Sequence, residues 1–261
     1  MQQNPENTSI MSRIDPDKIA ADSHVGLVRM LNEDCFAYYT GNDCPASFAL
    51  LADGIGGHES GNIASTLCTR IVLNSWRNSQ FSENSTEKEL SDFLSSEIIK
   101  ANSIIYNLNN MYQIQHPMGT TVVASIFFKD KVIVAHAGDS RFYRLRSGKL
   151  EQLTDDHSFV AELVRKNIIK PEEAPYHPFA HIISKSVGPV LEMAPEVNTF
   201  ERQPGDRYLL CTDGLTNHVE DNTIQGMMSE SATPYESVHR LLNSSLRGGG
   251  EDNITIICVW N

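Results

Sequence analysis

Two aspartates in this sequence stand at the end of strand-like runs and directly before glycine. Asp53 follows residues 50–52 and precedes Gly54, and Asp213 follows residues 209–212 and precedes Gly214. A buried strand that ends in this way holds a carboxylate at a fixed point, and the small residues after it leave room for an ion and its waters. The repeated arrangement predicts that both carboxylates serve one metal site.

Further acidic residues stand beside Gly, Asn or strand ends and could join this site. The full set comprises Glu33, Asp34, Asp53, Asp139, Asp213 and Asp252. Any one of them alone is better explained as a turn or capping residue, so the hypothesis rests on the set. Neighbouring carboxylates raise one another's pKa, and bound cations would relieve this cost if the acids converge.

Oxygen ligands favour Mg²⁺ or Mn²⁺ over structural zinc, and the sequence has no cysteine pair at zinc-type spacing. Two such ions, roughly 3.5–4 Å apart, can hold a water, lower its pKa and direct it at a phosphorus atom. The acids therefore predict a hydrolase that acts on phosphate esters.

The elements that would hold these acids can be predicted from hydrophobic periodicity. Apolar residues at three-to-four spacing predict helices at residues 60–76, 87–108, 159–166 and 235–246. Strands are predicted at residues 25–28, 35–39, 48–52, 207–211 and 254–259, and residues 121–153 are predicted to form an antiparallel meander. Residues 154–195 have no long apolar run, which indicates a surface excursion. This order of elements indicates an α+β layered domain.

Length and composition narrow the class of protein. The 261 residues, 40% of them hydrophobic, fit one large domain, with residues 1–20 as a loose polar arm and folded structure from about Ala21. The net charge of -12 argues against a nucleic-acid partner. No segment has the apolar core of a signal peptide or the roughly 20 apolar residues of a membrane span. We therefore expect a cytoplasmic protein with reduced cysteines and no membrane partner.

Seven short motifs occur together and in one order between residues 20 and 260. They are Arg29-x-x-Asn32-Glu33-Asp34, Ala52-Asp53-Gly54-Ile55-Gly56-Gly57-His58, Gly119-Thr120-Thr121, Ala137-Gly138-Asp139-Ser140-Arg141, Leu153-Thr154-x-Asp156-His157-Ser158, Cys211-Thr212-Asp213-Gly214-Leu215 and Glu251-Asp252-Asn253. In this set the chain resembles the metal-dependent (PPM, type-2C) Ser/Thr protein phosphatases, particularly their short bacterial members. Each motif is a weak signal, whereas seven in order are specific.

The resemblance implies a fold and a set of metal ligands. The fold would be a four-layer αββα sandwich, with two antiparallel sheets flanked by helices, over residues 21–261. Asp53 would bridge two Mn²⁺ or Mg²⁺ ions, Asp213 and Asp252 would complete the first ion's ligands, and the Gly54 carbonyl would bind the second. Glu33 and Asp34 would act largely through metal-bound waters. Asp139, with Asp213, would correspond to a third and weaker site.

The resemblance also suggests residues for substrate binding and proton transfer. Arg29 would clamp the substrate phosphate through its planar guanidinium. His58 is the nearest candidate to protonate the leaving alkoxide, although a structural role for it is equally expected, and Ile55 stands where many relatives have His. We expect His136 to be a satisfied core residue and His157 to be structural. Residues 157–187 would form a flap beside the active site, where Ser184-Lys185-Ser186 departs from the Arg-containing version of many relatives.

The predicted activity is direct hydrolysis of phosphoserine and phosphothreonine by metal-activated water. No Cys-x5-Arg loop is present for a cysteine-based route. Two alternatives stay open: a catalytically silent relative that binds phosphoproteins, and a metal-dependent hydrolase of small phosphate esters. The expected partners are phosphorylated proteins, produced by a Ser/Thr kinase, and the expected state is a monomer.

Overall fold

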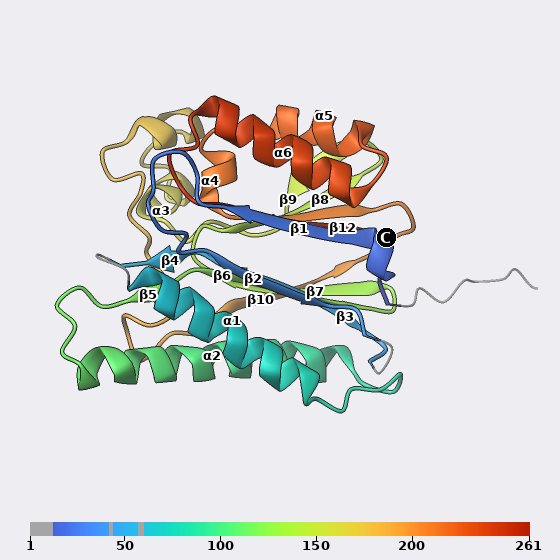
Figure 1. Ribbon diagram of the computed structural model, residues 1–261, viewed down its shortest axis with the longest axis horizontal. Helices are drawn as coiled ribbons and strands as arrows, with labels where there is room; N and C mark the ends of the chain where they lie inside the picture. Colours follow the sequence, from blue (N-terminus) through green and yellow to red (C-terminus); the bar gives the residue numbers. More distant parts are fainter. Residues whose placement is uncertain (1–12, 42–43, 57–59) are drawn as a thin grey trace, which may run out of the picture.

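The computed structural model describes residues 13–41, 44–56 and 60–261, and its helices and strands form four layers. Two five-stranded antiparallel sheets lie face to face in the middle, and helices cover the outer face of each sheet (Figure 1). The predicted α+β class and the two-sheet sandwich are confirmed. No helix in the described part of the chain has the length and apolar character needed to cross a bilayer.

The first sheet joins both ends of the chain. Its strands, in spatial order, are β1 (Ile19–His24), β12 (Ile254–Trp260), β11 (Arg207–Cys211), β8 (Arg141–Arg146) and β9 (Lys149–Gln152). The second sheet consists of β10 (Glu196–Glu201), β7 (Lys131–Ala137), β6 (Val122–Phe128), β3 (Ser47–Ala52) and β2 (Cys35–Tyr39). A small ribbon of β4 (Gly54–Ile55) and β5 (Gly119–Thr120) lies at one end of the sandwich.

Four of the helices lie where amphipathic patterns predicted them: α1 (Gly61–Arg77), α2 (Glu87–Met111), α3 (Phe159–Arg165) and α6 (Pro234–Gly248). α1 and α2 cover the second sheet, and α5 (Asp221–Glu230) and α6 cover the first (Figure 1). A capping box in which Thr86 and Glu89 bond each other's backbone amides begins α2. The short elements are η1 (Pro16–Lys18), α3 (Phe159–Arg165), η2 (Pro171–Tyr176) and α4 (Asp213–Thr216).

The core has three parts, which explains why β3 is apolar from Phe48 to Ala52. Phe48 and Leu50 pack under α1 and α2, whereas Ala49 and Leu51 point the other way and pack between the sheets. Successive side chains of a strand face opposite sides, so a strand buried on both faces needs apolar residues at every position. A third cluster fills the space beneath α5 and α6.

Three expectations about the elements were wrong. Residues 25–28 form a loop in which Leu27 and Val28 are exposed, and the strand lies earlier, at β1, where it pairs with β12. Folded structure also starts before Ala21, because Ile14 is buried and its amide donates to Ser47 Oγ at 2.8 Å. The apolar and polar residues of the half-buried strand β1 alternate only weakly, so hydrophobic periodicity did not predict its position.

The third error concerns the predicted meander. β6 and β7 belong to the second sheet, but β8 and β9 belong to the first, so the chain changes sheet between Ala137 and Arg141. Gly138 makes this change with a φ of 114°, in the region that favours glycine. Asp139 therefore lies at the junction of the sheets. Strand β10 and helix α5 were not predicted at all.

Candidate metal centre

An open cleft lies at the end of the sandwich where β3 and β7 end and α4 begins. Its volume is about 1360 Å³, and its lining includes Arg29, Glu33, Asp53, Gly54, Asp139, Asp213 and Asp252. Asp34 lies close enough to Asp53 to raise its pKa, so the predicted acids do come together. His58 lies outside the described residues.

Asp53 is held at the base of the cleft by its backbone. Its amide donates to Thr121 Oγ1 at 3.0 Å, and its carbonyl accepts from the Thr121 amide at 2.8 Å and from the Thr120 hydroxyl at 2.8 Å. Burial, followed by the charges of Asp34 and Asp213, raises the pKa of Asp53 well above its ordinary value. Without cations this carboxyl group resists ionisation.

The neighbouring acids show the same effect. Burial raises the pKa of Asp34 to about 7, although hydroxyl groups of Thr255 and Thr212 donate to its Oδ2 at 2.7 and 3.1 Å. Its Oδ1 is buried and has no hydrogen-bond partner among the described residues. Burial and the charge of Asp213 raise the pKa of Asp139 to about 7. An oxygen atom left without a donor among such acids fits a cation or its water as the missing partner.

Asp213 and Asp252 enter the cleft from two other segments. Asp213 opens α4 and accepts a bond at Oδ2 from Asn217 Nδ2 at 3.0 Å, and burial with the charge of Asp252 raises its pKa. Asp252 precedes β12 and accepts from Arg29 Nη2 at 2.7 Å. Arg29 is half exposed and lines the cleft.

Asn253 organises the loop that carries Arg29 and Glu33, a role that sequence reasoning did not assign. Its Oδ1 accepts from the Glu33 amide at 2.8 Å, and its Nδ2 donates to the carbonyls of Val25 and Leu31 at 2.9 and 3.0 Å. The buried side-chain amide of Asn253 thus holds residues 25–28, which were predicted as a strand, without pairing them to a sheet. Its position in the Glu251-Asp252-Asn253 motif was the available signal.

The glycines around the acids are required by close packing. A Cβ on Gly54 would lie 2.4 Å from backbone atoms of Gly61 and 2.6 Å from the Glu33 carbonyl. A Cβ on Gly214 would lie 2.0 Å from the Asn253 carbonyl. Side chains there would separate the segments that deliver the acids.

A family model described as protein phosphatase 2C matches residues 24–247, which is most of the chain and includes nearly all of the cleft. The chain belongs to the protein phosphatase 2C family. The predicted family membership is therefore confirmed.

Individual relatives support this assignment. The Ser/Thr phosphatase stp of Listeria welshimeri is 35% identical over 236 residues, which are 90% of this chain and 92% of that protein. The structure of the S. agalactiae Ser/Thr phosphatase is 33% identical, with a TM-score of 0.87 over 93% of this chain and 98% of that one. The catalytic domain of the Ser/Thr protein phosphatase PstP, solved in complex with two manganese ions, is 36% identical with a TM-score of 0.78 and the same coverages.

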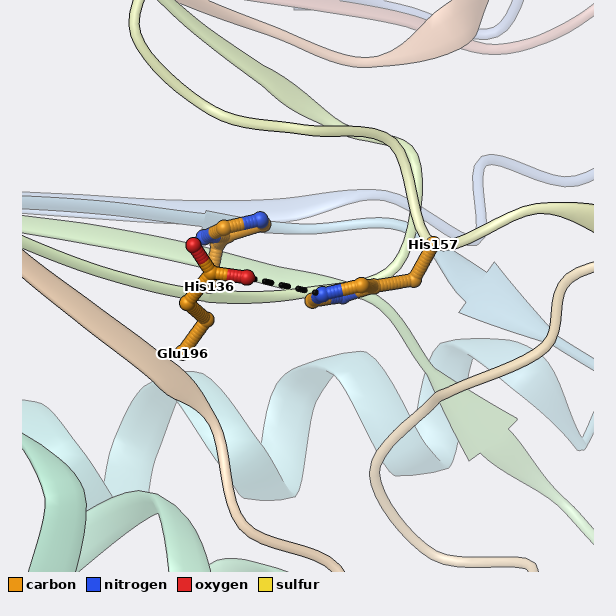
Figure 2. Close-up of side chains that lie close together, drawn as sticks. All are labelled: His136, His157 and Glu196. Atoms are coloured by element: carbon orange, nitrogen blue, oxygen red, sulfur yellow. Dashed lines mark hydrogen bonds and ion pairs between the residues drawn. The ribbon is translucent and has the colours of Figure 1, made fainter. Parts of the chain in front are cut away.

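Two buried histidines, His136 and His157, make structural contacts in this phosphatase 2C protein. His136 is buried and its Nε2 lies 2.9 Å from the Asp155 carbonyl, which confirms the prediction of a satisfied core residue. His157 is also buried, stacks on His136 and lies 3.4 Å from Glu196 (Figure 2). His181, predicted to lie in the surface excursion, lines the cleft.

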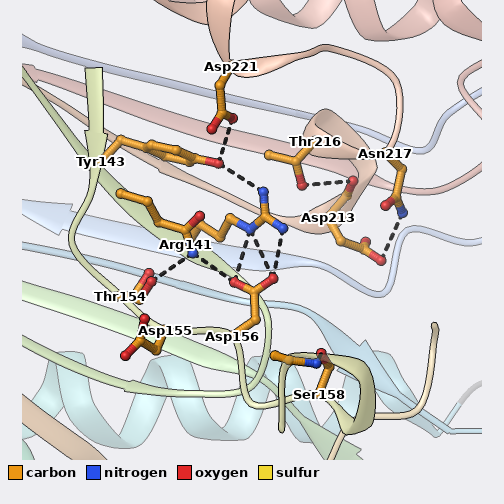
Figure 3. A network of polar contacts seen from close by, with 12 residues as sticks. Arg141, Tyr143, Thr154, Asp155, Asp156, Ser158, Asp213, Thr216, Asn217 and Asp221 are labelled. Atoms are coloured by element: carbon orange, nitrogen blue, oxygen red, sulfur yellow. Dashed lines mark hydrogen bonds and ion pairs between the residues drawn. The ribbon is translucent and has the colours of Figure 1, made fainter. Parts of the chain in front are cut away.

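A polar network centred on Arg141 lines the same cleft as the acids (Figure 3). Its Nε and Nη2 donate to Asp156 at 3.0 and 2.7 Å, and its Nη1 donates to the Tyr143 hydroxyl at 3.0 Å. Tyr143 in turn donates to Asp221 Oδ1 at 3.1 Å. A two-pronged bond of this kind fixes orientation as well as charge. The network joins β8, α5 and the start of the excursion next to the metal centre.

Proposed function

We propose that this protein hydrolyses phosphoserine and phosphothreonine side chains of proteins, using water activated at a binuclear Mn²⁺ or Mg²⁺ centre. The observation that carries the proposal is the convergence of acids from separate segments on one cleft, with the pKa values of Asp34, Asp53, Asp139 and Asp213 raised. Such a set suits hard divalent cations. Bound cations would favour the ionised carboxylates and offset the cost of their burial.

The ligand roles follow the family resemblance and are supported by the cleft lining. Asp53 would bridge two cations, Asp213 and Asp252 would complete the ligands of the first, and the Gly54 carbonyl would bind the second. The closeness of Asp53 to the other carboxylates supports its bridging role, since its pKa responds to the charges of both Asp213 and Asp252.

Three further acids have supporting roles in the proposal. Glu33 and Asp34 would act largely through cation-bound waters, which suits the unpartnered Oδ1 of Asp34. Asp139 would hold a third and weaker cation together with Asp213. The charge of Asp213 is the leading electrostatic influence on the pKa of Asp139, which supports their proximity.

When bound, two divalent cations lower the pKa of a shared water and align it with the phosphorus atom. Arg29 would bind the phosphate oxygens, because its guanidinium offers further donors beyond the one used on Asp252. His58 remains the proposed proton donor to the leaving alkoxide, on sequence grounds alone. We further propose that the substrates come from a Ser/Thr kinase and that the protein works as a cytoplasmic monomer, in a domain that includes Ile14 as well as residues 21–261.

A direct test uses the purified protein with a phosphothreonine peptide and, separately, with a nucleoside triphosphate. Phosphate release from the peptide should require added Mn²⁺ or Mg²⁺ and should stop in EDTA. Release that persists in EDTA would contradict the metal mechanism. Tight Mn²⁺ binding without turnover would favour the silent phosphoprotein binder, and turnover of the nucleotide alone would favour the hydrolase of small phosphate esters.

A further inference from the structure

His157 lies where the excursion leaves the metal centre, and it makes two bonds to one residue. Its amide donates to the Gly138 carbonyl at 2.9 Å, and its Nδ1 accepts from the Gly138 amide at 3.2 Å. Gly138 immediately precedes Asp139 and occupies the positive-φ turn between the sheets. The imidazole and the amide of His157 therefore fix the backbone of Gly138, which positions the Asp139 carboxylate.

We infer that His157 is a positioning residue for the metal centre: through Gly138 it holds Asp139 in the acid cluster and ties the predicted flap, residues 157–187, to it. The inference rests on the proposed function for its consequence in catalysis. The contacts themselves are independent of that function.

Further contacts connect Gly138, through Thr121, to Asp53 at the base of the cleft. Thr121 packs against Gly138, where an added Cβ would lie 2.6 Å from the Thr121 side chain, and Thr121 Oγ1 lies 2.7 Å from Ser140 Oγ. The same Oγ1 accepts from the Asp53 amide at 3.0 Å. Displacing Gly138 would thus disturb the residues on both sides of Asp139 and the support of Asp53.

The flap is fastened at the same point. The His157 carbonyl accepts from the Ser184 amide at 2.8 Å, and the next residue, Ser158, forms a bridge with Ile183. The outgoing and returning segments of residues 157–187 therefore meet beside Gly138. His157 therefore connects both segments to the turn that carries Asp139: its carbonyl bonds Ser184, and its side chain and amide bond Gly138.

The hydrogen bonds of the His157 ring favour a positioning role over a metal site formed with His136 and Glu196. Ligand atoms of His136, His157 and Glu196 lie within 4.8 Å of one another, which suggests a His-His-Glu cation site. However, the His157 Nδ1 lone pair accepts from Gly138, so in the neutral ring Nε2 carries the proton and faces Glu196 Oε2 at 3.4 Å. A neutral imidazole has no second lone pair for a metal.

The ring geometry points the same way. The His136 and His157 rings are parallel within 2° and stacked, with centroids 4.6 Å apart (Figure 2). A cation bound by two imidazoles lies near the plane of each ring, and stacked parallel rings have no common plane. Burial and the neighbouring His136 lower the pKa of His157 to about 4, so the ring is neutral near pH 7 and can accept from Gly138.

The test compares His157→Asn with His157→Gln in the full chain. The Asn Oδ1 can occupy the place of Nδ1 and accept from Gly138, whereas the longer Gln side chain carries its amide toward Glu196. We expect the Mn²⁺ concentration for half-maximal activity to stay within about threefold of wild type in the Asn variant and to rise at least tenfold, roughly, in the Gln variant. His136→Leu, which removes the stacked ring but leaves the Gly138 bonds, should resemble the Asn variant.

A second measurement does not depend on catalysis, so it distinguishes a local change at Gly138 from a general loss of folding. In metal-free protein, hydrogen exchange of the Gly138 amide should be slow in wild type and in the Asn variant, and fast in the Gln variant. Equal Mn²⁺ dependence in the Asn and Gln variants, or unchanged exchange at Gly138 in both, would overturn the inference. So would stoichiometric Zn²⁺ binding to wild type that is lost in Glu196→Gln. Wild-type protein without Mn²⁺-dependent activity would instead count against the proposed function.

Discussion

Arg29 and Asp252 form an ion pair at the mouth of the cleft, with Nη2 of the arginine 2.7 Å from Oδ2 of the aspartate. The arginine side chain is 50% exposed and the aspartate 34%, so the pair contributes little to stability. Its significance is geometric, because it holds a planar cation beside the acid cluster.

Replacing Arg29 should therefore affect substrate use more than stability. We expect Arg29→Ala to lower kcat/KM for a phosphothreonine peptide at least about tenfold, and Arg29→Lys to recover only part of it, since lysine lacks the two-pronged donor geometry. Unfolding free energies should change by about 1 kcal/mol or less. Arg240→Ala, which breaks the exposed pair with Glu230, is the matched control and should leave kcat/KM unchanged.

Asp53→Asn should separate catalysis from stability. Phosphate release should fall at least about 100-fold, because the proposed bridging ligand is lost. In EDTA at neutral pH the variant should melt above wild type, since it removes a carboxyl group whose pKa burial raises well above normal. Steady-state kinetics and thermal unfolding measure the two effects. Unimpaired turnover in this variant would rule out the bridging role.

The metal-free protein should lose stability as pH rises from about 4 to about 7. Asp34 and Asp139, with pKa values raised from 3.8 to about 7, hold protons in the folded state that the unfolded chain has released. His136 and His157 act in the opposite sense, because burial lowers the pKa of each, that of His157 to about 4, and their contribution is lost as pH falls from 6.5. The carboxyl groups with raised pKa values, which also include Asp53 and Asp213, are more numerous and should dominate.

Adding Mn²⁺ should remove this decline and release protons on binding. Thermal unfolding in EDTA and in Mn²⁺, at about pH 5 and about pH 8, would show a metal-induced gain that is larger at the higher pH. An equal gain at both values would mean that the acids with raised pKa do not take part in metal binding.

Two glycine substitutions should have opposite effects. Gly214→Ala places a Cβ 2.0 Å from the Asn253 carbonyl and should destabilise the fold by about 2 kcal/mol or more. Gly226 lies within α5, and a Cβ there meets nothing within 4 Å, so Gly226→Ala should stabilise by about 0.5–1 kcal/mol. Denaturant unfolding would check both values.

The Arg141 network should be costly to break from one side. Arg141→Met leaves Asp156 without its cationic partner in a partly buried setting, with only Gln152 Nε2 still donating to it, and should destabilise the protein by about 3 kcal/mol. Lys88→Met, which breaks an exposed pair with Asp92 on α2, should cost less than about 1 kcal/mol. Similar losses in both variants would show that the network is no stronger than a surface pair.

Much of the architecture was predictable because burial leaves a local record. Residues 87–108 carry apolar side chains at helical spacing, and α2 buries Leu90, Leu94 and Ile98 as that spacing requires. Residues 48–52 were predicted as a strand because β3 is buried on both faces. β1 was misplaced because it is only partly buried, with a single residue, Ile19, inside the core.

The sequence by itself determined which carboxylates line the candidate site, because carboxylates between apolar runs and glycines are local features. Only the tertiary structure decided how they are held. Asn253 bonds the Glu33 amide across 220 residues, and β7 and β8 separate into different sheets at Gly138. Neither the pairing partner of a strand nor the target of a side-chain amide is encoded in periodicity, since both depend on which distant segment arrives beside it. The His157 contact with Gly138 belongs to the same class of information.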